Sequence, residues 1–114
     1  IDLWIEETGY FYKNGDHRIM AFNITSELEN VFSALETLNR QHGRATKLRE
    51  RPMNKAFGNQ GCPCLVHLVK DIPYIALGPN DDFSKIHGVD ESINPSLLGI
   101  SAQQIITAVE VFCN

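Results

Sequence analysis

The sequence lacks several features that would assign it to a class at once. No stretch approaches the roughly 18 consecutive apolar residues that a membrane helix needs, and the start of the chain has no signal-peptide pattern. No repeat, low-complexity tract or domain linker is present. Cysteine is scarce: there are three, and Cys62 and Cys64 are too close for an easy mutual disulfide. We therefore expect no membrane span and at most one disulfide.

An excess of positive charge is also missing. The formal net charge is −4 at pH 7, so the chain as a whole does not attract nucleic-acid phosphates. The apolar fraction of 43% and the charged fraction of 21% are close to globular averages, which argues against disorder. With 114 residues the chain can bury one core but not two, so residues 1–114 are expected to form a single soluble domain.

The cellular compartment stays open. The chain begins Ile1-Asp2 without a methionine, and we expect a cleaved or excised chain. Asn23-Ile24-Thr25 is a glycosylation sequon, which matters only if the protein is secreted.

The first half of the chain predicts a β-hairpin followed by a helix. Residues 3–5 and 9–12 are strand-like, and Lys13-Asn14-Gly15-Asp16 is a turn sequence before a strand over residues 18–24. Ser26 and Glu29 have the spacing of a capping box, and apolar residues then recur at helical spacing as far as a glycine at position 43.

The second half predicts further strands and a closing helix. Residues 45–51 fit an edge strand, and residues 64–69 and 72–77 are apolar runs that fit two strands or one bent strand. Asn94-Pro95 predicts a short helical turn, and Ser101 with Gln104 predicts a second capped helix. This order predicts an α+β fold, with an antiparallel or mixed sheet of four to five strands and two main helices packed on one face.

The loop from Gly78 to Glu91 gathers residues that could bind a metal ion. It contains Asp81, Asp82, His87, Asp90 and Glu91, and imidazole nitrogen and carboxylate oxygen are the ligands that zinc takes in catalytic sites. The predicted metal ligands are His87, Asp81, Asp82 and Glu91. The alternative interpretation is a polar surface loop that binds nothing specific.

Two segments carry a resemblance to a known family. Ile72-Pro73-Tyr74-Ile75-Ala76-Leu77-Gly78-Pro79, followed by Ile86-His87-Gly88-Val89-Asp90-Glu91-Ser92-Ile93, resembles the C-terminal segment of the zinc-dependent aminoacylase and carnosinase family. The resemblance covers roughly residues 61–112 and implies that His87 is a zinc ligand. The family's other zinc ligands and its general base lie in an N-terminal region that this chain lacks. The resemblance therefore implies a fragment or relic of a zinc-dependent amide-bond hydrolase.

A second candidate site contains Cys62 and Cys64. These thiols stand beside Gln60, with His67 and His87 downstream, and a thiol hydrolase needs a thiolate, an imidazole and a donor to the oxyanion. Cys62, Cys64 and His87 are the candidate catalytic residues. Buried structural cysteines are the alternative, since an apolar run follows them.

The basic residues are concentrated between Arg40 and Lys55, where six of the ten occur. Within this stretch, Lys47, Arg49 and Arg51 would share one face of a strand, with Arg44 just before it. No aromatic residues alternate with them for base stacking, so an acidic protein surface or an anionic ligand is favoured over nucleic acid. A solvated edge strand protected by its charge is the alternative. The leading hypothesis is a small non-catalytic interaction or ligand-binding domain with a basic edge strand.

Overall fold

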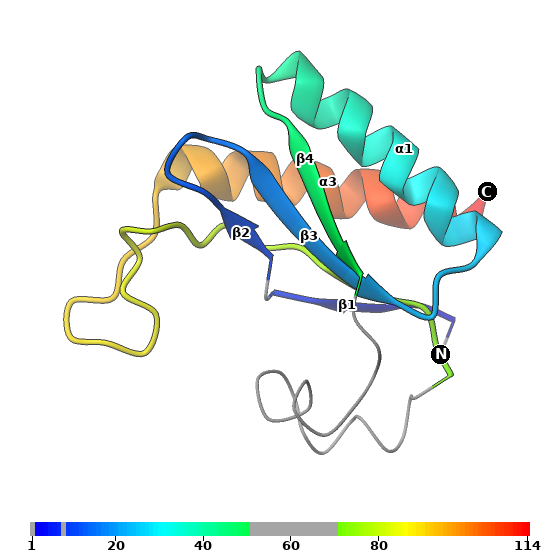
Figure 1. Cartoon of the computed structure of the whole chain (residues 1–114), viewed down its shortest axis with the longest axis horizontal. Coiled ribbons are helices and arrows are strands. Elements are labelled where there is room, and N and C mark those ends of the chain that lie inside the picture. Colours follow the sequence, from blue (N-terminus) through cyan, green and yellow to red (C-terminus); the bar gives the residue numbers. More distant parts are fainter. Residues whose placement is uncertain (1, 8, 51–70) are drawn as a thin grey trace.

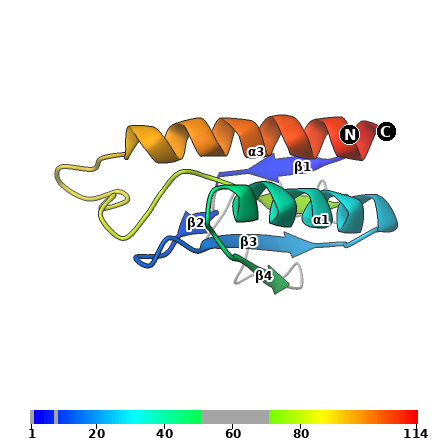
Figure 2. The ribbon, with the colours of Figure 1, turned by 90° about the horizontal axis from the view of Figure 1, so that it is seen from above.

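The chain folds into a layer of helices on a five-stranded mixed sheet, as seen in a computed structural model that describes residues 2–7, 9–50 and 71–114. In chain order the elements are β1 (Trp4–Glu6), β2 (Tyr10–Phe11), β3 (His17–Phe22), α1 (Ser26–Gln41), β4 (Thr46–Glu50), β5 (Tyr74–Ala76) and α3 (Pro95–Cys113). Helices α1 and α3 run antiparallel, side by side, over one face of the sheet (Figures 1 and 2). The predicted α+β class is confirmed.

Strands β2 and β3 form the predicted hairpin. Tyr10 pairs with Arg18 and Phe11 with His17 in antiparallel register. In the turn between them Gly15 has φ +96°. This is a left-handed backbone conformation, which residues other than glycine adopt only at an energetic cost. The glycine of the predicted turn is therefore required by its backbone geometry.

Strand β3 lies at the centre of the sheet. One of its edges pairs in parallel with β4, from His17 to Ala21, and the other pairs with β2 and then with β5, both antiparallel. Strand β1 pairs in parallel with β5. Among the described residues β4 and β1 are the outer strands, as the edge-strand prediction for residues 45–51 required of β4. Residues 72–77 contain β5, whereas the predicted run over residues 64–69 lies outside the described part of the chain.

The N-terminal cap of α1 differs from the prediction by one residue. Thr25 has extended backbone angles (φ −103°, ψ 171°), and its side-chain oxygen accepts the N–H of Leu28 at 3.2 Å. Ser26 is the first helical residue, so the capping box of Ser26 with Glu29 was wrong. Both Thr25 and Ser26 can cap a helix, and the residue that keeps the extended conformation does so.

Helix α3 is one continuous helix, not a short turn followed by a second helix. The Asn94 side chain accepts the N–H of Ser96 at 3.0 Å, and Pro95 occupies the first turn, where its missing N–H leaves no hydrogen bond unmade. Ser101 and Gln104 lie inside the helix and are buried. The second capping box was therefore wrong, because Asn94 already starts the helix and burial stabilises its continuation.

Both faces of the sheet bury apolar side chains. Toward the helices, Ile19, Ile75 and Leu77 of the sheet region pack with Leu28, Val31 and Leu35 of α1 and Ala108 of α3. On the opposite face lie Trp4, Met20, Phe22, Tyr74 and Ala76. There the Phe22 and Tyr74 rings stack with centroids 4.1 Å apart, and Trp4 meets Tyr74 edge-on at 4.8 Å. Alternation along the strands therefore supplies two apolar layers.

Candidate functional site

The acidic loop is anchored at its start by Asp81. One oxygen of its carboxylate accepts the N–H of Phe83 at 2.9 Å and the hydroxyl of Ser84 at 3.2 Å. Ser84 is buried, and the backbone at Asp81 bridges to Phe11 of β2. From this anchor the loop extends beyond the end of the sheet (Figure 1). Asp81 thus helps to fold the loop.

Asp82 holds the loop to the hairpin through Tyr10. The Tyr10 hydroxyl donates a hydrogen bond of 2.7 Å to the Asp82 carboxylate. This hydrogen bond, followed by burial and by the negative charge of Asp82, raises the pKa of Tyr10 from 10.0 to about 12. The Arg18 guanidinium lies over the same ring, 5.0 Å from its centroid. A carboxylate, a phenol and a guanidinium therefore stand in contact across the loop, β2 and β3.

We expect Asp82→Asn to return the pKa of Tyr10 toward 10.0, because the charged acceptor is the main cause of the shift. The phenolate is followed by ultraviolet absorbance during an alkaline titration, with Tyr10→Phe to identify its signal. A Tyr10 titration unchanged in Asp82→Asn would show that the hydrogen bond is not the cause.

The other predicted metal ligands lie in the outer part of the loop. His87 and Glu91 are exposed, and the backbone is left-handed at Lys85, His87 and Asp90, with φ between 52° and 61°. Within residues 2–7, 9–50 and 71–114, no group of three or more His, Cys, Asp or Glu side chains is arranged to hold a metal ion. The structure thus does not gather His87, Asp81, Asp82 and Glu91 into one site, and zinc binding through them stays a prediction.

The predicted partner-binding residues fall into two groups. Arg44 is folded inward: its guanidinium donates to the Gly15 carbonyl at 2.8 Å and lies 5.1 Å from the centre of the Phe11 ring. Lys47 is exposed on β4 and pairs in register with Arg18 of β3. Two positions further along, residue 49 pairs with Met20, while Arg51 lies outside the described part. Arg44 therefore stabilises the β2–β3 hairpin. Among the basic residues of β4 whose side chains are described, Lys47 faces solvent.

The thiol site was predicted in a segment that the structure does not describe. Cys62 and Cys64 both fall there, as does His67. The cysteine that is described, Cys113, is exposed and free at the end of α3. The thiol-hydrolase interpretation therefore stays a prediction.

The sequence analysis missed a buried polar cluster between the sheet and both helices. His17 of β3, Asn39 of α1 and Gln104 of α3 are all fully buried. The amide nitrogens of Asn39 and Gln104 each lie 3.3 Å from Nδ1 of His17. Because amide groups donate, Nδ1 accepts and the ring proton resides on Nε2. Asn39 also accepts from Gln104 at 2.8 Å, so the three side chains tie β3, α1 and α3 together.

Burial is the main reason that this imidazole stays neutral. Burial, together with the smaller effect of the positive charges of Arg44 and Arg18, lowers the pKa of His17 from 6.5 to about 4. The Phe11 ring packs on the imidazole, with centroids 4.6 Å apart.

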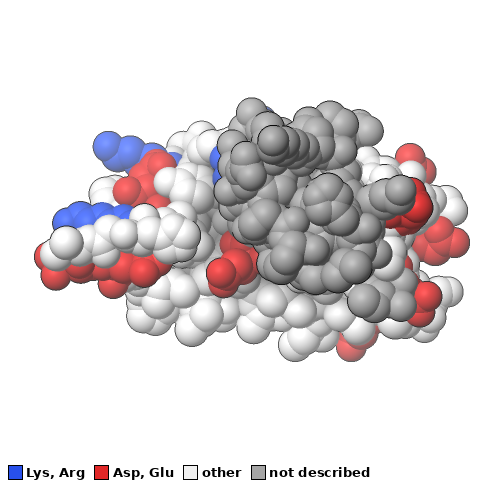
Figure 3. Space-filling view, turned by 90° about the horizontal axis from the view of Figure 1, so that it is seen from below, with Lys and Arg blue, Asp and Glu red and all other residues white. Residues whose placement is uncertain are grey.

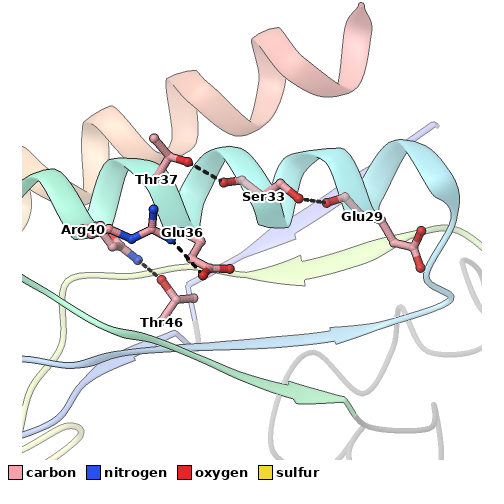
Figure 4. A network of polar contacts seen from close by, with 7 residues as sticks. Glu29, Ser33, Glu36, Thr37, Arg40 and Thr46 are labelled. Carbon is pink, nitrogen blue, oxygen red and sulfur yellow. Dashed lines mark hydrogen bonds and ion pairs between the residues drawn. The ribbon is translucent and has the colours of Figure 1, made fainter.

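A surface hollow lies beside this cluster. It has a volume of about 340 Å³ and is lined by Glu36, Arg40, Gly43, Arg44, Ala45 and Thr46. Thr46 connects the two features, since its hydroxyl accepts from Asn39 at 2.9 Å. Figure 4 shows Thr46 beside α1, where Arg40 and Glu36 form an ion pair of 3.0 Å. Both charges that border the hollow on α1 are thus paired with each other.

Helical spacing could have revealed the buried cluster. Asn39 continues the apolar stripe of Leu28, Val31 and Leu35, and Gln104 lies on the stripe of Leu97, Ser101 and Ala108. A polar residue at a core position of a helical pattern needs a buried partner. In α3 this signal is weaker, because the neighbouring Ile105, Ile106 and Val109 are more apolar than the buried Ser101, Gln104 and Ala108.

Comparison of the chain with protein-family models, curated proteins and solved structures gave no match. The resemblance to the aminoacylase and carnosinase family therefore rests on the segments quoted above and stays a prediction.

Proposed function

We propose that the chain is a small non-catalytic interaction domain that binds an acidic partner along β3 and β4. The observation that carries this proposal is the cross-strand pair of Arg18 and Lys47, which stand directly opposite each other in the sheet. Like charges in this arrangement destabilise a sheet. A partner that supplies negative charge would remove this repulsion and gain two favourable contacts.

The surroundings support a defined orientation of this charge. Arg18 lies over the Tyr10 ring, and the Tyr10 hydroxyl donates a hydrogen bond to Asp82, so two successive contacts position the guanidinium. Lysine and arginine side chains lie close to acidic ones at one end of the face opposite the helices (Figure 3). On a chain with a net charge of −4, a local basic row can discriminate between partners. An acidic protein segment fits such a row on an outer strand.

The test is charge reversal in the double variant Lys47→Glu/Arg49→Glu. With a polyglutamate peptide as the probe, we expect the affinity to fall about tenfold or more and to depend less on salt. Unfolding should not explain the loss, because Lys47→Glu turns a repulsive pair with Arg18 into an attractive one.

The matched control is Lys13→Glu/Lys85→Glu, which makes the same change in net charge at the hairpin turn and in the loop. The peptide affinity of this control should change much less. An equal loss in both double variants would mean that net charge alone governs binding, and the proposal would be rejected.

A further inference from the structure

Helix α3 carries a second apolar stripe beside the one that it buries. The buried positions are Leu97, Ser101, Gln104 and Ala108. The second stripe consists of Leu98, Ala102, Ile105, Ile106 and Val109, and its large side chains are 41% to 58% exposed. With 3.6 residues per turn these positions fall on one side of the buried stripe. The polar residues Ser96, Gln103 and Glu110 fall on the other side.

The polar side of α3 is the one turned toward α1. Gln103 is hydrogen-bonded to His42, just after α1, at 3.1 Å. The exposed apolar stripe therefore faces away from α1, which lies beside α3 in Figure 2. Nothing in the described part of the chain buries it.

The loop that precedes α3 in the chain also exposes large apolar side chains. Of the ten large apolar side chains that are exposed among the described residues, eight lie between Phe83 and Val109. Their exposed fractions add up to about four complete side chains. This is on the order of 600 to 800 Å² if one large side chain exposes roughly 150 to 200 Å². For comparison, the largest contiguous apolar patch on a typical monomer is about 300 to 600 Å².

We propose that a second copy of this chain covers the surface, with the two α3 helices packed antiparallel about a two-fold axis. A standard interface buries about 800 Å² on each partner, which is close to the area that this segment exposes. The stripe contains no charged residue, so it offers nothing to select a charged partner. A self-complementary contact needs only that the same apolar patch meets itself. Ala102, near the middle of the stripe, lets two helices approach closely.

The sheet edge formed by β1 is compatible with the same two-fold axis between the α3 helices. Leu3 and Ile5, on either side of Trp4 in β1, pack against the core cluster that includes Ala108 of α3. Within the described residues β1 pairs with β5 and is the last strand of the sheet on this side. Figure 2 shows β1 next to α3. A second copy brings an identical short edge, so the two β1 strands can pair antiparallel beneath the paired helices.

A lipid bilayer is the competing occupant, because α3 is long and apolar enough to cross a membrane by length and composition. Its place in the fold argues against this. Gln104 and Ser101 are buried, and Gln104 is hydrogen-bonded to His17 and Asn39, so leaving the fold would break the buried cluster. Lying on a membrane surface favours lysine and arginine along the helix, and α3 has neither.

Sedimentation equilibrium and light scattering of the purified chain test the proposal. We expect twice the 12.8 kDa of one chain at micromolar concentration. Ile106→Lys should raise the dimer dissociation constant about 100-fold or more, because two charges enter the apolar centre of one interface. Gln103→Lys places the same charge on the polar side of the same helix and should leave the dissociation constant unchanged. Circular dichroism establishes that both variants are folded.

Three results would overturn the proposal. These are a mass of one chain at every concentration, an equal effect of Ile106→Lys and Gln103→Lys, and sedimentation of the wild-type chain with phosphatidylcholine vesicles that Ile106→Lys abolishes. The polyglutamate assay separates this proposal from the proposed function: Ile106→Lys should keep peptide binding, and Lys47→Glu/Arg49→Glu should keep the dimer.

Discussion

Replacing Gly78 with alanine is expected to lower the free energy of unfolding by about 3 kcal/mol or more. A Cβ at this position would lie 2.2 Å from the carbonyl oxygen and 2.9 Å from the carbonyl carbon of Glu7, and both atoms belong to the backbone. The backbone cannot move aside cheaply, because the N–H of Leu77 donates to the carbonyl of Glu6 at 2.8 Å. A Cβ at Gly9 would likewise lie 2.6 Å from backbone atoms of Leu77. The two chain segments touch where only glycine fits.

Urea unfolding of Gly78→Ala and Gly99→Ala measures this effect against a matched control. Gly99 lies inside α3, and a Cβ there would have no neighbour within 4 Å. Gly99→Ala should therefore raise the free energy of unfolding by about 0.5 to 1 kcal/mol, since alanine favours a helix. If Gly78→Ala proved as stable as the wild type, the close approach of residues 7 and 78 would be wrong.

Acidification from pH 6.5 to pH 4 is expected to remove about 3 kcal/mol of stability through His17 alone. The pKa of His17 is about 4 in the folded chain and 6.5 without the fold, because burial disfavours the charged ring. The contribution is therefore fully present above pH 6.5 and is lost as the pH falls toward 4. Within this window the unfolded chain binds the proton more tightly. On a protonated ring Nδ1 also carries a hydrogen, so it could no longer accept hydrogen bonds from the amide groups of Asn39 and Gln104.

The variant His17→Gln tests this pH dependence. Its amide oxygen can accept the hydrogen bonds that Nδ1 accepts, and it does not titrate. Free energies of unfolding at pH 7.5 and at pH 4.5, from urea titration, should differ by roughly 2 to 3 kcal/mol less in His17→Gln than in the wild type. The control is His87→Gln, which changes an exposed histidine and should keep the full difference. An identical loss of stability in wild type and His17→Gln would contradict a buried neutral imidazole.

Much of the fold could be predicted from local patterns. The hairpin followed from a turn sequence with glycine at a left-handed position, and the body of α1 followed from apolar residues at helical spacing. The outer strand β4 followed from its charge. Each of these signals is contained in about five to fifteen neighbouring residues, where backbone conformation and burial favour the same element.

Helix α3 was predicted less well, because its sequence fits two core faces. Ile105, Ile106 and Val109 are more apolar than Ser101, Gln104 and Ala108, yet the less apolar set is buried. Hydrogen bonds to His17 and Asn39 make this arrangement favourable, and both partners are far away in the sequence. A pattern within one helix does not contain that information.

The candidate sites show the same division. The sequence identified the acidic loop and the basic stretch as unusual, but it treated Arg44 and Lys47 as equivalent and Asp81 and Asp82 as ligands. In the structure Arg44 is bound to the hairpin, and Asp82 to Tyr10. These contacts join β2 to residues distant in sequence, so they depend on how the strands are ordered.

By itself the sequence determined the class of the fold, the hairpin, α1 and the concentration of charge, because short-range patterns of burial and backbone preference encode these. Only the tertiary structure decided which face of α3 is buried, which charged side chains remain exposed, and that His17, Asn39 and Gln104 meet in the core. The physical reason is that the burial and the hydrogen bonds of a side chain depend on the residues that surround it. A residue's role is therefore set by partners that the order of the strands and helices brings to it.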